Sequence, residues 1–315
     1  MTKTSAPISL IGLPYLMGKR APGTGYQIAA GPDRLLASDA LPAALGEEFS
    51  DVEVTMLDGI DDPGQGDTED YRLLPRGDQM ARQLVQYSHL SRAVRKARDA
   101  GRFPLVAGGT CSSALGMVGG VSGGDIGMIW FDAHGDAQTP DTSMNGFFEG
   151  MPVSTIAGLC WPRYRAQIPG FEVIDQERII TVGNHEVYSP DARKGDFDLQ
   201  ALGQVVDPPV IAEHGFEAAM TDALDNLRKQ VSEVYVHFDS DVLDPSELRA
   251  NTHAAVGGLT VAECTLAMRL IAERFTIRAF NITAWDPDVD PRGLDVLVPF
   301  MVETALTATR TLPSI

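Results

Sequence analysis

The side chains with the clearest chemical potential are carboxylates and an imidazole that follow two apolar segments. Asp132, His134 and Asp136 alternate at the end of MIWFDAHGD, and Asp239 and Asp241 do so in VYVHFDSDVLDP. Alternate residues of an extended segment point to one side. Unpaired carboxylates are strongly destabilised in an apolar core, whereas carboxylates that converge on one point hold divalent cations. One Asp-x-Asp pair alone is more often a helix cap or a turn than a metal site, but the two clusters together predict a metal site.

A third segment, LVAGGTCSS, supplies a candidate sulfur ligand. Its Gly-Gly turn is followed by Thr110, Cys111, Ser112 and Ser113. In one interpretation Cys111 is a small buried hydrophobic residue and the serines cap the next helix. In the other its thiolate binds a metal ion, and it then suits zinc, iron or cobalt better than the harder manganese ion.

Strands that end at a common edge must position these residues. Nearly continuous apolar runs alternate with amphipathic helices, which predicts an α/β fold with a mostly parallel sheet and ligands beyond the carboxyl ends of its strands. We expect strands over 8–15, 52–59, 102–109, 125–134, 178–184, 233–244 and 277–286, and helices over 31–45, 78–101, 216–232 and 260–275. We also expect surface loops at 61–77 and 161–170, and no linker or repeat divides the single domain predicted over 1–315.

The acidic composition of the chain limits the classes of partner that it can bind. The chain carries 25 Lys and Arg against 43 Asp and Glu, a formal net charge of −18. Such a surface repels phosphate backbones and anionic lipids, so we expect no nucleic-acid or membrane partner, and a small cationic substrate instead. The chain shows no signal peptide or long apolar span and has an odd number of cysteines, three. These features predict a cytoplasmic location.

The chain resembles the ureohydrolase superfamily of arginases and agmatinases. The resemblance rests on GGTCS at 108–112, DAHGD at 132–136, DSDVLDP at 239–245 and VGGLT at 256–260, in the family's order and spacing. It implies a three-layer αβα sandwich, assembly into homotrimers or hexamers, and two divalent metal ions, most commonly Mn²⁺. A hydroxide between these ions attacks the guanidinium carbon and releases urea or a urea analogue.

The resemblance also implies a role for each ligand candidate. Asp132 and Asp239 would bridge the two metals, and His134 and Asp241 would hold one of them. Asp136 would complete the other site and accept a hydrogen bond from the hydroxide. Cys111 stands where the family has a ligand histidine, which leaves Zn²⁺, Fe²⁺, Co²⁺ and Ni²⁺ open beside Mn²⁺.

Two departures bear on catalysis and substrate. Glu149 stands where arginases have a histidine thought to shuttle protons; it could replace that acid-base function or bind a cationic group of the substrate. Ala284 stands where the family has a glutamate facing the guanidinium, which argues against plain arginine or agmatine. Trp285, Asp286 and Asp288 lie close by in sequence and are candidates for a replacement contact.

The remaining predicted site residues surround the pocket mouth. Glu186 and Tyr188 correspond to acidic positions near the substrate's α-amino group in arginases, and Gln138 and Asn145 are candidates for binding a substrate carboxylate. His253 is a further catalytic candidate. His185 is a second candidate for lining the pocket.

We therefore expect a metal-dependent hydrolase of C–N bonds in linear amidines, acting on a guanidino or amidino compound other than plain arginine. The cysteine at position 111, in place of the ligand histidine, also resembles the hydroxyarginine hydrolases of antibiotic pathways within the superfamily. Two alternatives stay open: a catalytically degenerate member that serves as a binding or assembly subunit, and an amide-hydrolysing enzyme with the same metal cage.

Overall fold

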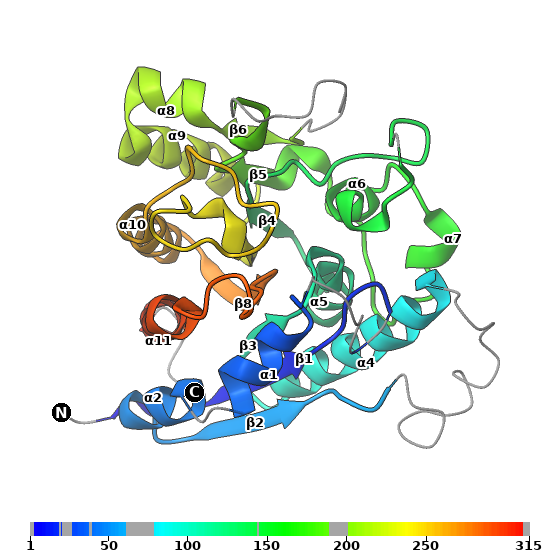
Figure 1. The fold of residues 1–315 in the computed structure, drawn as a ribbon, viewed down its shortest axis with the longest axis vertical. Helices are drawn as coiled ribbons and strands as arrows, with labels where there is room; N and C mark the ends of the chain where they lie inside the picture. Colours follow the sequence, from blue (N-terminus) through cyan, green and yellow to red (C-terminus); the bar gives the residue numbers. More distant parts are fainter. Residues whose placement is uncertain are drawn as a thin grey trace.

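A parallel eight-stranded sheet forms the centre of the described part of the protein (Figure 1). The computed structural model describes residues 3–18, 20, 27–37, 40–60, 79–143, 145–188 and 201–310. The strands run in the order β2-β1-β3-β8-β7-β4-β5-β6, and every pairing is parallel. They are β1 Ile8–Leu13, β2 Val52–Met56, β3 Phe103–Gly108, β4 Ile126–Phe131, β5 Ile179–Val182, β6 Gln204–Val206, β7 Glu233–Asp239 and β8 Thr276–Thr283.

All seven predicted strands form, each inside its expected range or within one residue of it. The eighth, β6, was not predicted, because its three residues are too few to show a periodic pattern. The sheet is therefore fully parallel in the described residues, where the sequence predicted a mostly parallel one.

Helices cover both faces of the sheet and complete the predicted three layers (Figure 1). One face packs against α4 Gln79–Asp99, α5 Ala114–Val121, α6 Pro152–Ile156 and α7 Pro162–Arg165. The other packs against α1 Ala30–Ala37, α2 Ala40–Glu48, α8 Pro208–His214, α9 Phe216–Arg228, α10 Val261–Ala272 and α11 Gly293–Arg310.

Strand periodicity divides the apolar core into these two halves. In β3, Leu105 and Ala107 join the cluster under one helical layer, and Val106 between them joins the other. In β7, Val234 and Tyr235 divide in the same way. Both faces are buried, so the strands read as continuous apolar runs instead of alternating ones.

The predicted helices at 78–101, 216–232 and 260–275 are confirmed as α4, α9 and α10, and Thr260 and Glu263 form a capping box at the start of α10. The single helix expected over 31–45 is wrong, because this region contains the two helices α1 and α2. Helices α5, α6, α7, α8 and α11 were not predicted. Every residue of α5 is buried, so it lacks the polar face that marks an amphipathic helix.

The two predicted loops have different outcomes. The loop expected at 61–77 lies outside the described residues. The loop expected at 161–170 contains the short helix α7. Among the described residues, no helix is long and apolar enough to cross a membrane.

Candidate metal centre and active site

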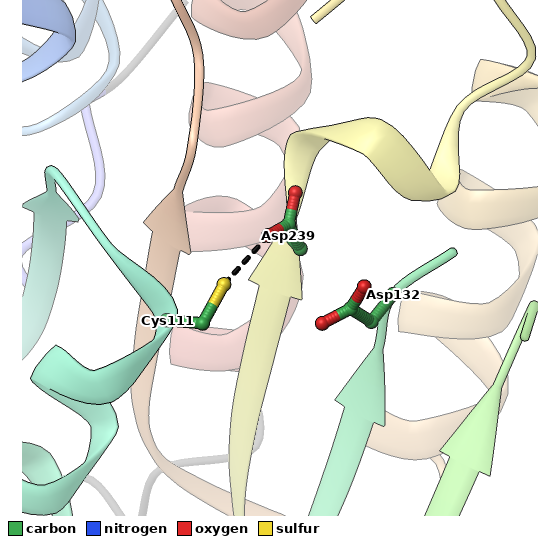
Figure 2. Close-up of side chains that lie close together, drawn as sticks. All are labelled: Cys111, Asp132 and Asp239. Carbon is green, nitrogen blue, oxygen red and sulfur yellow. Dashed lines mark hydrogen bonds between the residues drawn. The ribbon is translucent and has the colours of Figure 1, made fainter. Parts of the chain in front are cut away.

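The carboxyl ends of β3, β7 and β4 bring three predicted ligands together (Figure 2). Cys111 follows β3, Asp239 ends β7 and Asp132 follows β4. One ligand atom from each of these residues lies within 4.8 Å of the other two, and Asp132, His134 and Asp241 form a second set by the same measure. Asp132 belongs to both sets, as expected of a residue that joins two neighbouring metal sites.

Cys111 directs its sulfur at a ligand partner, although the residue also belongs to the apolar cluster on one face of the sheet. Its sulfur donates a 2.6 Å hydrogen bond to Asp239 Oδ2 (Figure 2). The sulfur also lies 3.3 Å from Thr283 Oγ1, at the end of β8. The turn before it needs glycine, because a Cβ at Gly109 would lie 2.2 Å from the carbonyl oxygen of Tyr15. Thus the Gly-Gly turn allows the end of β3 to pack closely against the segment after β1, and it places the thiol of Cys111 beside the end of β7.

The carboxylates are oriented by donors from their own strand ends. Asp132 accepts from the backbone of His134 at 2.7 Å and from Trp130 Nε1 at 3.0 Å. Asp239 Oδ1 accepts from the backbone N–H of Asp241 at 2.8 Å. All three aspartates are at most 3% exposed. Buried carboxylates in fixed orientations form a preorganised cation site.

His134 lies among three carboxylates. Its Nδ1 faces Asp132 Oδ1 at 3.1 Å and Asp241 Oδ2 at 3.6 Å, and its Nε2 faces Glu186 Oε2 at 3.3 Å. A histidine that binds a metal through one nitrogen commonly donates the other N–H to a carboxylate. Glu186, which was predicted to contact the substrate, therefore already has His134 as a partner within the protein.

Burial dominates the electrostatics of the cluster. Burial, followed by the charges of Asp241 and Asp132, raises the pKa of Asp239 well above 3.8. Burial and the charges of Asp239 and Asp132 likewise raise the pKa of Cys111, which keeps it a thiol without a cation. Burial lowers the pKa of His134, but Asp241 and Asp132 outweigh it and raise that pKa well above 6.5. The protonated imidazole thus serves as counter-ion where a metal would bind.

These residues fit two divalent cations. Three buried carboxylates, a buried thiol and a partly buried imidazole converge here, and they repel one another or retain protons in the absence of a cation. A metal removes that repulsion and displaces the protons. Asp136 belongs to neither close set, although its carboxylate lies in the same cavity.

A cavity of about 160 Å³ opens above the two ligand sets. The predicted residues along its wall are Cys111, His134, Asp136, Gln138, Asn145, Glu149, Glu186, Asp239, Asp241, His253 and Ala284. Among the described lining residues there is no lysine or arginine. The wall therefore has an excess of negative charge and suits a cationic ligand.

Glu149 is held firmly in this wall. Its Oε1 accepts from Gln83 Nε2 at 2.7 Å, and its Oε2 accepts from the backbone and side chain of Ser112 at 3.2 and 2.5 Å. Burial raises the pKa of Glu149, and the hydrogen bonds from Ser112, Thr110 and Gln83 counteract that rise. Ser112 follows Cys111, so one short turn positions both the thiol and this carboxylate.

Two cavity residues have left-handed backbone conformations. Asp136 has φ 47° and Ala284 has φ 63°, a region that non-glycine residues seldom occupy. The carbonyl of Ala284 accepts from Asn251 Nδ2 at 2.9 Å. Unusual backbone angles of this kind concentrate at functional sites.

Several predicted contacts do not reach the cavity. Tyr188 is 52% exposed and donates to Asp207 at 2.6 Å. His185 is buried, and its ring nitrogens face the carbonyls of Gly183 and Ala255. Neither residue lines the cavity.

The segment after Ala284 also points elsewhere. Trp285 is buried and donates to the carbonyl of Asp290. Asp286 accepts from the backbone N–H of Gln27, and Asp288 is exposed outside the cavity lining. The replacement contact suggested for Trp285, Asp286 and Asp288 is therefore wrong for this structure.

Asn251 is a site residue that sequence reasoning missed. It donates to Asp241 Oδ2 at 3.0 Å and to the Ala284 carbonyl, and it lines the cavity. Its position two residues before His253 was the only available signal. Gln83 was missed as well, because it reaches Glu149 from the second turn of α4, 66 residues away in the chain.

Known proteins match nearly the whole chain. The family model "Arginase family" matches residues 6–314. The arginase of Bacillus caldovelox is 30% identical over 294 residues, covering 91% of this chain and 93% of that relative. A solved arginase structure from Bacillus caldovelox has a TM-score of 0.75 at 26% identity, covering 96% of this chain and 98% of that one.

A more distant structure shares the fold. Formimidoylglutamase from Bacillus subtilis has a TM-score of 0.67 at 17% identity and covers 100% of this chain and 89% of that one. The matches confirm the resemblance inferred from the four sequence motifs. The chain belongs to the arginase family of hydrolases, which act on carbon–nitrogen bonds in linear amidines.

Proposed function

We propose that the protein is a metal-dependent hydrolase of a guanidino or amidino compound other than plain arginine. The observation that carries this proposal is the pair of ligand sets sharing Asp132 below a cavity whose described wall has no cationic side chain. The family relationship supports the reaction class. The substrate itself is inferred from the residues of the cavity.

Cys111, Asp132 and Asp239 would hold one divalent ion, and Asp132, His134 and Asp241 would hold the second. We assign Asp136 to the metal site as well, because it lines the cavity beside these sets. When bound, such ions supply a water of lowered pKa that can attack an electron-poor carbon. Mn²⁺ is the first candidate, and the sulfur ligand keeps Zn²⁺, Fe²⁺, Co²⁺ and Ni²⁺ in competition.

Other wall residues would bind and orient the substrate. Gln138 and Asn145 lie on one loop, which is closed by the 2.9 Å hydrogen bond from Gln138 N to the Gly150 carbonyl. Their amides can donate to a carboxylate on the substrate. His253 is exposed at the cavity and its ring centroid lies 6.4 Å from that of His134, so it can deliver a proton from solvent to the leaving amine.

Ala284 supports a substrate other than arginine. Its methyl group lines the cavity and offers no charge to a guanidinium. Formimidoylglutamase, named for a different substrate, has the same fold, so the fold leaves the substrate open. The predicted trimer or hexamer and the cytoplasmic location stay predictions.

The test combines metal analysis with a substrate panel. The purified protein should bind two divalent ions per chain and release urea or a urea analogue from at least one guanidino or amidino compound. A protein that binds no divalent metal contradicts the proposal. A protein that binds metal and hydrolyses no member of the panel favours the degenerate binding subunit, and one that hydrolyses only amides favours the third alternative.

A further inference from the structure

We infer that Glu149 binds the cationic amidine end of the substrate and so determines which substrates enter. This inference deepens the proposed function and rests on it. Glu149 is 8% exposed and lines the cavity. The structure leaves its carboxylate without a cationic partner among the described residues around it.

The other cavity carboxylates belong to a ligand set or face His134, apart from Asp136, which is in neither set and which we assign to the metal site above. Asp239 and Asp241 belong to the two ligand sets, and Glu186 faces His134 Nε2. Among the described residues, the donors to Glu149 are neutral: the Gln83 amide, the backbone and hydroxyl of Ser112, and the Thr110 side chain. Neutral donors orient a carboxylate without cancelling its charge, so the charge remains available to a guanidinium or amidinium.

Ala284 makes this carboxylate more important. A methyl group at that position supplies no anion, although it lines the same cavity as Glu149. Recognition of a planar cation by hydrogen bonds requires an acceptor, and carboxylates are the strongest acceptors for N–H groups of this kind. Glu149 provides this acceptor from the turn Phe148–Gly150, which is far from Ala284 in the sequence.

The turn is rigid enough to act as a fixed anchor. Phe148 is buried between Trp161 and Tyr164, with ring centroids 6.2 and 5.4 Å away. Behind it, the Gly150 carbonyl accepts from Gln138 N at 2.9 Å. A carboxylate that is already in place loses little entropy when it binds a ligand.

The same rigidity argues against proton shuttling by Glu149. A shuttle must take up and release a proton at each turnover, whereas both oxygens of Glu149 already accept hydrogen bonds from donors of the protein, which favours the ionised form. His253 is exposed at the cavity and fits that task better. Glu149 is thus the anchor and His253 the proton carrier.

Glu149→Gln is a fair test because the network can accept an amide. Gln83 Oε1 is buried and has no hydrogen-bond partner in the described structure. If the Gln83 amide rotates by half a turn, this oxygen accepts from the new Nε2, and the new carbonyl still accepts from Ser112. The variant therefore removes the charge and keeps the hydrogen bonds that residue 149 makes with Gln83 and Ser112; the weaker 3.4 Å hydrogen bond from Gln83 Nε2 to Ser112 Oγ is lost.

The experiment compares two probes of nearly equal shape, propylguanidinium and neutral propylurea. Their dissociation constants are measured by calorimetry on the metal-loaded protein, for wild type, Glu149→Gln and Glu149→Asp. Asp141→Asn is the matched control, because Asp141 is exposed on the same loop. We expect wild type to prefer the cation and Glu149→Gln to lose about 10-fold or more of that preference, the scale of one charge-assisted hydrogen bond.

Glu149→Asp should recover part of the preference, and Asp141→Asn should keep all of it. An unchanged preference in Glu149→Gln overturns the inference. If that variant also loses one limb of the pH profile of kcat, Glu149 transfers protons instead of binding the cation. Binding is measured without turnover. A protein that prefers propylguanidinium but hydrolyses no amidine supports the anchor and contradicts the proposed function, so the two failures are distinguishable.

Discussion

The sulfur of Cys111 donates a 2.6 Å hydrogen bond to Asp239 Oδ2, across the end of β8. This contact joins the segment after β3 to the end of β7. It places a soft donor among hard carboxylates, in a set completed by Asp132. From the sequence, Cys111 could be a core residue or a metal ligand. Its position among the carboxylates favours the ligand.

Cobalt binding reports directly on this sulfur. We expect the Co²⁺-loaded protein to show a thiolate-to-cobalt charge-transfer band in the near ultraviolet, because a bound metal deprotonates a coordinating thiol. Cys111→Ser should abolish the band and weaken metal binding. Cys160→Ser is the control, since Cys160 is also buried but contacts Ser154 and Thr155 instead. A band that survives in Cys111→Ser refutes the ligand role.

Glu186 should act through His134 and not only through the substrate. Removing the carboxylate in Glu186→Ala should weaken divalent metal binding by about 10-fold, because the 3.3 Å contact to His134 Nε2 is lost. Glu186→Gln keeps an acceptor and should recover most of the affinity. Competition with a fluorescent chelator measures both, with exposed Glu177→Ala as control. An elevated KM with unchanged metal affinity would return Glu186 to a substrate contact alone.

Asn251 should strengthen metal binding by the same ligand set, because it holds the ligand Asp241 in place. Asn251→Ala removes the 3.0 Å hydrogen bond to Asp241 and leaves the Ala284 carbonyl with one donor fewer. We expect metal affinity to fall by about 10-fold and the melting temperature to decrease. Thr252→Ala, at the exposed next residue, should change neither quantity. Equal metal affinities in the two variants would show that Asp241 needs no support from Asn251.

Glu149 should also produce a defined pH dependence of stability. Burial raises its pKa above 4.5 despite the hydrogen bonds from Ser112. A raised carboxyl pKa costs nothing below the unfolded pKa, and stability is lost as the pH rises through the folded pKa. In metal-free protein, the free energy of unfolding of Glu149→Gln relative to wild type should therefore increase as the pH rises above 4.5, the ordinary pKa of a glutamate.

Urea unfolding at several pH values measures this difference. Exposed Glu172→Gln is the control and should differ from wild type by the same amount at every pH. A Glu149→Gln difference that stays constant, or decreases with pH, contradicts the direction of the pKa shift.

Local patterns were sufficient for most of the fold. Long apolar runs such as β4 and β7, buried on both faces, can be recognised from composition and length alone. Elements without a polar face or with interruptions were harder to recognise. The buried helix α5 packs so closely that a Cβ at Gly120 would lie 2.5 Å from Val94, and α11 contains Pro299 within its length. Tertiary packing overrides local propensity in both helices.

By itself, the sequence determined the ligand candidates, because alternation after an apolar strand places Asp132 and His134, or Asp239 and Asp241, on one side of the chain. Only the tertiary structure decided which partners they meet. Asn251 reaches Asp241, Gln83 holds Glu149, and Tyr188 turns away to Asp207. Such contacts join segments far apart in the chain, and their geometry depends on how the helices pack on the sheet, which no local period encodes.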